Sequence, residues 1–450
     1  MKISFHGADR DVTGSCHLLD TGSLRILIDC GLFQGSRTLA AENSAEFGFD
    51  PASIDLVVLT HAHLDHCGRL PLLVKRGFRG EILTTAASRD LASLVLLDSA
   101  HLQLEEAERN STEPLYTPED VKTTLARFKR TAEYAENTAL SATVELTMFD
   151  AGHILGSASP RFEVIDAGVV RTIAFSGDLG NAGRPLLRDP SPPLNSEIVV
   201  METTYGDRLH RPIDESVREL IQVVGAALTR GGNVVIPTFA LERAQEILYF
   251  LKAGGDRKQL PETMRVFLDS PQAIAATELF RKHLESLSAD AVAQFTTGKD
   301  PLAPAGLECT RDRTASCAIN DVHAGAVILA GSGMATGGRV LYHLRRELPR
   351  AESAIVFVGY AANGTPARRI IDGADNVRLL GEYVPVRARV TTIGGFSAHA
   401  DRDELLAWHA RVAPRRTFLV HGEVATMRAF AARLPPGAID MPGPGQSFDL

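Results

Sequence analysis

The chain has 450 residues, of which 44% are hydrophobic and 23% are charged, and its formal net charge is −8. This balance is typical of a globular enzyme, and it argues against a basic protein that coats nucleic acid along its whole surface. The length favours one long domain or two.

The first 206 residues alternate short β-rich runs with glycine turns, and helical stretches interrupt them. Apolar residues recur at helical spacing over 87–109, and a second helix is expected after Pro118. The strand-like runs are RILIDCG, DLVVLTHAH, GEILTT, VELTMFDAGH, RTIAFSGD and EIVVMETTYG.

From residue 207 to residue 382 the pattern changes, because strand-like runs now alternate strictly with helices. Continuous apolar runs of this kind are typical of a parallel sheet that is buried on both faces. We therefore predict a separate α/β domain over 207–382. The four runs are NVVIPTF (233–239), MRVFLDS (264–270), AVILAGSG (326–333) and AIVFVGY (354–360).

The segment 383–450 returns to the style of the first part. An inserted domain inside a discontinuous first domain, 1–206 with 383–450, explains this order better than three separate domains. No run approaches the roughly 18 consecutive apolar residues of a membrane helix, and MKISFHGADR lacks the apolar core of a signal peptide. We therefore expect a cytoplasmic protein with no membrane partner.

The five cysteines are odd in number, scattered, and without a CxxC pair. This pattern argues against a disulfide framework and against a cysteine zinc site. We expect reduced thiols that are buried as small hydrophobic groups. They are Cys16, Cys30, Cys67, Cys309 and Cys317.

A loop directly after the apolar strand LVVLT carries a dense set of metal-binding side chains: His61, His63, Asp65 and His66. Alternate residues of such a loop can converge on one point, and the next two on a neighbouring point. Neutral imidazole suits zinc, and a carboxylate can bind or bridge it. Because neighbouring side chains seldom complete a coordination sphere, we expect further ligands from elsewhere in the chain.

Three candidates stand at the ends of other strand-like runs. His153 follows VELTMFDAG, Asp178 ends RTIAFSG, and His421 ends RTFLV, each with glycine close by. Sites in open sheets gather at such strand ends. Together with the histidine-rich loop they form a candidate metal constellation.

This constellation resembles the metallo-β-lactamase superfamily, whose HxHxDH motif is intact over 61–66. The resemblance implies two Zn²⁺ ions, one held by His61, His63 and His153, the other by Asp65, His66 and His421, with Asp178 bridging them. It also implies that Asp29 in LIDCG orients the loop histidines, as carboxylates commonly do. Without the family resemblance, Asp29 is interpreted as a turn residue before Gly31.

That superfamily contains β-lactamases, glyoxalases, lactonases and nucleases, so the fold alone does not give the function. Further motifs look like the β-CASP nuclease group, and most closely like bacterial and archaeal relatives of the subunit that cleaves pre-mRNA before polyadenylation. The resemblance implies an αββα sandwich with an inserted parallel-sheet α/β (β-CASP) domain. The motifs are Glu202 in METTYGDR, PTFALERAQE (237–246), DSP (269–271), GSGMATGGR (331–339), GFSAHAD (395–401) and VHGE (420–423).

Phosphodiester hydrolysis needs a nucleophile, charge stabilisation and a leaving-group acid. Two metals about 3.5–4 Å apart supply the first two by activating a bridging hydroxide, so Asp65 and Asp178 act through the metals. His399, with an ordinary pKa near ~6.5, suits the acid that protonates the ribose 3′ oxygen. By family likeness, Glu202 pairs with His399 and keeps it protonated. The hypothesis is a zinc-dependent endoribonuclease acting on single-stranded RNA, with 5′-to-3′ exonuclease activity as an addition.

The run 332–338 lies between a buried strand and a helix, where backbone amides attract phosphate and glycines permit close approach. An ordinary turn has the same composition. Arg243 and Arg339 could add phosphate contacts, although such arginines are often solvated surface. The residues that we expect to bind substrate are Ser270, Ser332, Gly333, Thr336 and Gly337.

Two other functions are open. Hydrolysis of a small ester or thioester, as in glyoxalase II, fits the metal motif, but the inserted domain and His399 argue against it. An inactive RNA-binding scaffold fits the family, but such subunits typically lose metal ligands, and all seven are present here. Relatives often dimerise, so a homodimer is also an expectation.

Overall fold

The computed structural model describes residues 1–35, 37–359 and 361–450. Two compact units divide the chain: residues 1–209 with 399–450, and residues 210–398. The chain therefore leaves the first unit, forms the second, and returns. Tyr360, the last residue of the run AIVFVGY, lies outside the described residues.

The first unit contains a sheet of six strands: β1 (Lys2–Phe5), β2 (His17–Asp20), β3 (Arg25–Ile28), β4 (Leu56–Val58), β5 (Glu81–Leu83) and β21 (Ser447–Asp449). Their order is β21-β1-β2-β3-β4-β5. The first strands pair antiparallel, whereas β3, β4 and β5 are parallel. The carboxyl end of β4 therefore leads directly into the histidine-rich loop.

A second sheet in the same unit has seven strands: β6 (Asn137–Ala139), β7 (Val144–Asp150), β8 (Ala158–Asp166), β9 (Val169–Phe175), β10 (Ile198–Glu202), β19 (Arg416–Val420) and β20 (Ala438–Asp440). Their order is β20-β19-β10-β9-β8-β7-β6. Because β9, β10 and β19 run parallel, their carboxyl ends meet at one edge.

The two sheets pack face to face over an apolar core. The side chains of β10 alternate between the two faces of the second sheet. Ile198 and Val200 pack into the core between the sheets. Val199 and Met201 point the other way, against the residues of the helices that cover the second sheet. Strand β10 is thus buried on both sides.

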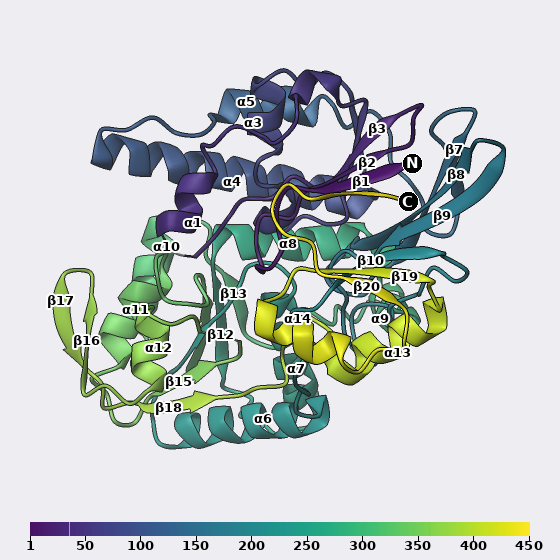
Figure 1. Ribbon diagram of the computed structural model, residues 1–450. Coiled ribbons are helices and arrows are strands. Elements are labelled where there is room, and N and C mark those ends of the chain that lie inside the picture. The colour runs from purple at the N-terminus through teal and green to yellow at the C-terminus, as the bar shows by residue number, and fades with distance from the viewer. Residues whose placement is uncertain (36, 360) are drawn as a thin grey trace. The chain divides into compact units, whose positions relative to one another are not determined.

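Helices cover the outer faces of both sheets, which makes the unit an αββα sandwich (Figure 1). The helix predicted over 87–109 is α4, and the helix expected after Pro118 is α5, whose first turn is fixed by a capping box between Thr117 and Asp120. The helices of this unit are α1 (Arg37–Glu42), α2 (Leu64–Cys67), α3 (Leu70–Lys75), α4 (Ala86–Asn110), α5 (Pro118–Leu125), α13 (Arg402–Val412) and α14 (Val424–Ala431).

The second unit is built on a fully parallel sheet, as predicted. Its strands are β11 (Val234–Pro237), β12 (Arg265–Asp269), β13 (Leu307–Cys309), β14 (Ala326–Ala330), β15 (Ala354–Phe357) and β18 (Arg389–Thr392). Their order is β13-β12-β14-β11-β15-β18. Val234 and Ile236 pack into one core and Val235 into another, so both faces of the sheet are buried.

Helices and one hairpin surround this parallel sheet. The helices are α6 (Ile213–Thr229), α7 (Arg243–Asp256), α8 (Pro271–Lys282), α9 (Ala289–Thr296), α10 (Arg313–Ala318), α11 (Val340–Glu347) and α12 (Pro366–Ile371). The hairpin is β16 (Asn376–Leu379) with β17 (Glu382–Pro385).

The second unit ends later than the boundary that the sequence suggests. The sequence places it at Glu382, whereas the compact unit continues to Ala398. The reason is β18, which pairs in parallel with β15, and Ile393 and Phe396, which lie in the core of the second unit.

The expectation of buried thiols was wrong for two of the five cysteines. Cys16, Cys30 and Cys67 are buried, but Cys309 and Cys317 are exposed. Cys309 belongs to β13, which is an edge strand, so one side of its backbone meets no neighbouring strand.

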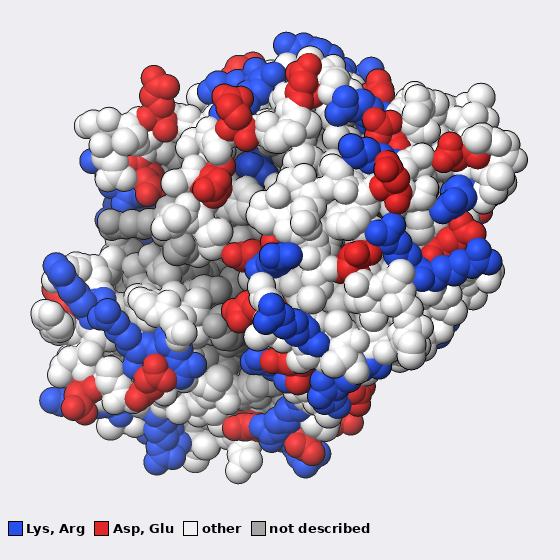
Figure 2. Space-filling view, viewed as in Figure 1, with Lys and Arg blue, Asp and Glu red and all other residues white. Residues whose placement is uncertain are grey.

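Charge is spread rather than gathered on the face that Figure 2 shows, where acidic and basic side chains are interspersed. A polyanionic ligand that binds to this face would therefore need a local cluster of positive charge, because the charges of the face as a whole are mixed. Among the described residues, the helices are all too short or too polar to cross a membrane.

Candidate metal centre

The histidine-rich loop connects β4 to the short helix α2, and hydrogen bonds hold it at both ends. Thr60 carries the first anchor, because its backbone N–H donates to Asp29 Oδ1 (2.8 Å) and its carbonyl accepts from Ala158 N–H (2.9 Å). His63 is the residue before α2, and Asp65 lies in the first turn of that helix. The loop therefore presents its side chains from a fixed backbone.

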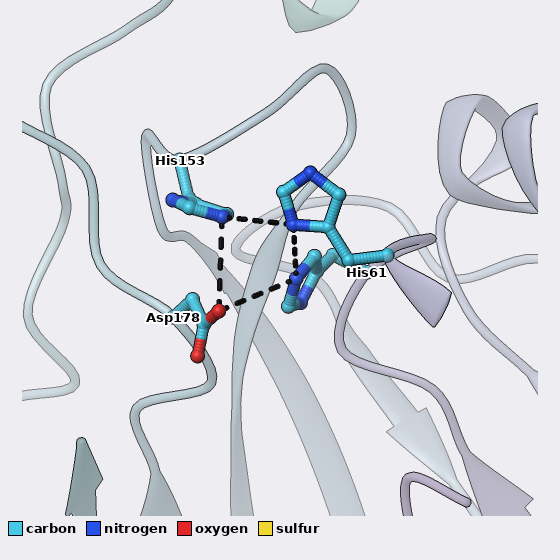
Figure 3. A group of neighbouring side chains, drawn as sticks. His61, His153 and Asp178 are labelled. Carbon is cyan, nitrogen blue, oxygen red and sulfur yellow. Dashed lines mark hydrogen bonds and ion pairs between the residues drawn. The ribbon is translucent and has the colours of Figure 1, made fainter. Parts of the chain in front are cut away.

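One group of donor atoms combines this loop with the ends of β7 and β9. His63 Nδ1 lies 3.1 Å from both His61 Nε2 and His153 Nε2. Asp178 Oδ2 lies 3.6 Å from His61 Nε2 and 3.7 Å from His153 Nε2. Figure 3 shows the side chains of His61, His153 and Asp178 turned toward one another.

A second group stands on the other side of the same aspartate. Asp178 Oδ1 lies 3.3 Å from His66 Nε2 and 3.6 Å from His421 Nδ1, and His421 Nε2 lies 3.7 Å from Asp65 Oδ2. Within each group the donor atoms lie within 4.8 Å of one another. The two oxygens of Asp178 thus face the two groups, one oxygen toward each.

The donor set fits metal ions better than it fits a hydrogen-bonded cluster. Within the described residues, four buried atoms here have no hydrogen-bond partner: His66 Nε2, His421 Nε2 and both oxygens of Asp178. Burial lowers the pKa of His61 well below its usual value and that of His63 to about 4, so both rings are neutral, the form that binds a metal. Nitrogens about 2.0–2.1 Å from a tetrahedral zinc are a little over ~3 Å apart, which matches the spacing of the first group.

Three of these histidines have a hydrogen-bond partner at Nδ1. Asp29 Oδ2 lies 2.7 Å from His66 Nδ1, Thr60 Oγ1 lies 3.0 Å from His61 Nδ1, and Thr204 Oγ1 lies 3.0 Å from His421 Nδ1. Such partners fix the tautomer and the ring orientation of a ligand. The sequence indicated Asp29 for this position but not the two threonines.

Asp29 has a backbone conformation that few residues adopt, with φ at 61°. Aspartate tolerates this left-handed region better than most residues because its short side chain is polar and unbranched. The turn aims the carboxylate at Thr60, whose N–H and hydroxyl both donate to it at 2.8 Å. Both interpretations of the sequence therefore hold: Asp29 is a turn residue, and it contacts the histidine loop.

Glu202 and His399 form a pair beside the first donor group. Glu202 ends β10 and is 1% exposed, and its carboxylate lies 3.4 Å from His399 Nδ1. His399 Nε2 lies 4.0 Å from Asp178 Oδ2. Burial lowers the pKa of His399, but the Glu202 and Asp178 carboxylates outweigh burial and raise it to about 9. The ring can therefore hold a proton next to the donor groups.

The backbone around His399 is locked to the loop after Asp178. Ala400 N–H donates to the carbonyl of Leu179 (2.7 Å), and Asn181 Nδ2 donates to the carbonyl of His399 (2.8 Å). Immediately after, a capping box between Asp401 and Glu404 begins α13. The position of His399 is thus set by the loop after Asp178 and by the start of α13.

The five residues expected to bind substrate all belong to the second unit. Ser270 is the N-cap of α8, where its hydroxyl accepts from Ala273 N–H (3.2 Å). Ser332 Oγ accepts from Thr336 N–H (3.1 Å), which closes the loop that contains Gly333 and Gly337.

The two arginines suggested as phosphate contacts turn toward the protein instead. Arg243 is buried in an ion pair with Glu246. Arg339 donates to Asp269 Oδ1 (2.7 Å) and to the carbonyl of Thr310 (2.8 Å). Their guanidinium groups satisfy buried acceptors, which sequence spacing alone cannot reveal.

Three family models match the chain. The model of the metallo-beta-lactamase superfamily matches residues 9–87, the Beta-Casp domain matches 244–370, and the Zn-dependent metallo-hydrolase RNA specificity domain matches 383–436. The first and third of these contain six of the nine clustered residues: His61, His63, Asp65, His66, His399 and His421.

Relatives match over nearly the whole chain. Ribonuclease TTHA0252 of Thermus thermophilus is 46% identical over 434 residues, which cover 96% of each chain. Transcription termination factor FttA of Methanocaldococcus jannaschii is 33% identical, over 96% of this chain and 68% of the relative. A crystal structure of a protein of unknown function from Enterococcus faecalis V583 shares the fold, with a TM-score of 0.60 at 13% identity over 100% of this chain and 99% of that one.

Proposed function

The chain belongs to the β-CASP group of the metallo-β-lactamase superfamily, and from this premise we propose that it is a zinc-dependent endoribonuclease. The observation that carries the proposal is a pair of donor groups, each facing one oxygen of Asp178, with the Glu202–His399 pair beside them. A relative with the name ribonuclease at 46% identity supports the substrate class.

The residues that would hold the ions divide as the donor groups do. His61, His63 and His153 would hold one zinc ion, and Asp65, His66 and His421 the other, with Asp178 shared between them. Bound zinc would supply positive charge for the phosphate and would acidify a water molecule for in-line attack.

His399 would act as the acid for the leaving group. It would hold a proton at Nε2, while Nδ1 faces Glu202. As the bond between phosphorus and the ribose 3′ oxygen breaks, that proton passes to the oxygen. The products are then a 3′-hydroxyl on one fragment and a 5′-phosphate on the other.

Glu202 would act through His399 and not on the RNA itself. Its carboxylate is buried and accepts from Leu179 N–H (2.6 Å), so it is held in place to orient the imidazole. Asp29 would play the equivalent part for His66 in the second donor group. Ser270, Ser332, Gly333, Thr336 and Gly337 remain proposed contacts of the RNA backbone in the second unit.

The glyoxalase II type of reaction is not favoured. A small thioester needs no RNA specificity domain, and the matching family models include one, together with a Beta-Casp domain. A homodimer, 5′-to-3′ exonuclease activity and a cytoplasmic location stay predictions from the sequence.

A cleavage assay with labelled single-stranded RNA tests the proposal, with single-stranded DNA and a thioester in parallel. We expect RNA fragments with 5′-phosphate ends, loss of cleavage with a chelator, and loss of cleavage in His399→Ala. His101→Ala, at an exposed position on α4, is the matched control and should cleave like wild type. Turnover of the thioester with intact RNA would overturn the proposal.

A further inference from the structure

An exposed aromatic side chain stands apart from the rest of the second unit. The chain has 19 phenylalanines, and among the described residues Phe239 is the one phenylalanine that is exposed, at 46%. Exposed apolar rings cost free energy in water, and this one follows directly on a buried strand. Its exposure therefore needs a reason.

The backbone on both sides of Phe239 is fixed. Thr238 N–H donates to the carbonyl of Ala330 (3.0 Å), which continues the pairing of β11 with β14, and Thr238 Oγ1 donates to the carbonyl of Phe239 (3.1 Å). The ring is thus presented by the end of a central strand and not by a loose loop.

Two glycines lie against the ring. A Cβ atom added at Gly333 would lie 3.0 Å from Phe239 Cε2, and one added at Gly359 would lie 3.9 Å from the same atom. Because neither glycine has a side chain, the ring packs closely on backbone atoms on this side. The rest of the ring stays open to solvent, which is the form of a stacking platform.

The platform stands at the carboxyl edge of the parallel sheet, where ligands of such sheets usually bind. Its neighbour Gly333 belongs to the loop that Ser332 and Thr336 close. Ser270, at the end of β12, has its hydroxyl 3.9 Å from a Cβ added at Gly331. Hydroxyls and loop amides suit phosphate oxygens, and an open aromatic ring suits the face of a base.

We infer that Phe239 stacks on one nucleobase of the RNA, next to a backbone phosphate held by the Ser332–Gly338 loop. The inference rests on the proposed function and deepens it. It requires an unstacked, single-stranded nucleotide at that position, because a base inside a duplex has no free face. It requires no particular base, since every base offers the same aromatic surface.

The test uses full-length Phe239→Ala and Phe239→Leu, with Tyr383→Ala as the matched control. Tyr383 is a still more exposed aromatic residue, at 77%, but it lies on the β16–β17 hairpin. RNA affinity is measured by fluorescence anisotropy in a His399→Ala background, and KM and kcat are measured in the otherwise native enzyme. We expect Phe239→Ala to weaken RNA binding about 5- to 100-fold and to raise KM, with zinc content unchanged. Phe239→Leu should fall between Phe239→Ala and wild type, and Tyr383→Ala should match wild type.

A second series of substrates locates the base. A single abasic ribose is moved along the RNA, one position at a time. At one position the native protein should lose as much affinity as Phe239→Ala loses, and Phe239→Ala should lose nothing further there. Gly333→Ala should weaken the same position, because its methyl group displaces the ring.

Two results separate this inference from the proposed function. If the native enzyme cleaves RNA and Phe239→Ala binds RNA as tightly as wild type, the stacking inference is overturned and the nuclease stands. The inference is also overturned if Phe239→Ala weakens every abasic substrate by the same factor, which would point to a disturbed fold or to a protein contact. If the native enzyme cleaves no RNA, the proposed function itself fails.

Discussion

Replacement of Asp29 by asparagine tests the link between the turn after β3 and the second donor group. Asparagine has the same shape and also tolerates the left-handed backbone at φ 61°. Its oxygen can keep the 2.8 Å hydrogen bond from Thr60 N–H, but its NH₂ group then faces His66 Nδ1, which lies 2.7 Å from Asp29 Oδ2. His66 can accept that hydrogen bond only with its proton on Nε2, the atom that faces Asp178. A protonated nitrogen cannot bind a metal.

The expected loss follows from this change of tautomer. The hydrogen-bond partners of a metal ligand are typically worth 10- to 100-fold in metal affinity, or about 1.4–2.7 kcal/mol. The larger loss should fall on the metal ion of the second donor group, because Asp29 contacts His66 directly, whereas it reaches His61 only through the hydroxyl of Thr60.

Competition with a chromophoric chelator measures the two zinc affinities separately. Asp29→Asn should show one affinity that stays close to wild type and one that is weaker by the factor above, with kcat/KM reduced in parallel at limiting zinc. Asp256→Asn, on the exposed end of α7, is the control and should change neither. Two unchanged affinities in Asp29→Asn would refute the reasoning, and so would an equal loss at both sites.

Three further outcomes are expected. His399→Ala should lower kcat roughly 10²- to 10⁴-fold, and Glu202→Gln should lower kcat less. Mass spectrometry should find the native amount of zinc in both variants. Loss of zinc in either variant would mean that the replaced residue is a metal ligand. Removal of zinc with a chelator should lower the free energy of unfolding by about 2.7 kcal/mol for each site, relative to protein with free zinc at roughly 100 times the Kd of that site. An unchanged melting curve would contradict a site that forms only in the folded state. Burial lowers the pKa of His6 to about 4, so near pH ~6.5 this side chain binds a proton in the unfolded chain but not in the folded chain. The stability that His6 contributes above that pH should therefore be lost as the pH falls toward 4. Denaturant titrations at several pH values should show a smaller loss in His6→Gln.

Much of the metal centre could be predicted because its densest part is local. His61, His63, Asp65 and His66 lie within six residues, and the apolar strand before them fixes where the loop starts. His153 illustrates the opposite case, since a single histidine after a strand is ordinary. Its partnership with His63 across 90 positions came from the family resemblance.

The supporting contacts were harder to foresee. Thr204 reaches His421 across 217 positions of chain, and nothing in its own neighbourhood distinguishes it from any threonine at a strand end. Thr60 had a signal, because it adjoins the histidine loop, but the geometry that turns its hydroxyl to His61 is set by Asp29. Long-range hydrogen bonds of this kind depend on the packed sheets and not on local pattern.

In the second unit, the same limit applies to charge and exposure. Arg339 looks like a solvent-facing helix residue in sequence, yet it donates to the buried Asp269, which also accepts from Ser316 Oγ (2.6 Å) and lies 2.7 Å from His343 Nε2. Phe239 looks like a buried strand residue, yet it is exposed. In both cases the loops after neighbouring strands decide the outcome, and their course is a tertiary property.

The metal content of the purified protein tests the central claim most directly. Elemental analysis by mass spectrometry should find about two zinc ions per native chain, as a two-metal hydrolase requires. Asp178→Ala, which removes a carboxylate that faces both donor groups, should lose most of both ions. A native chain without stoichiometric transition metal, or an Asp178→Ala variant that keeps both ions, would contradict the account.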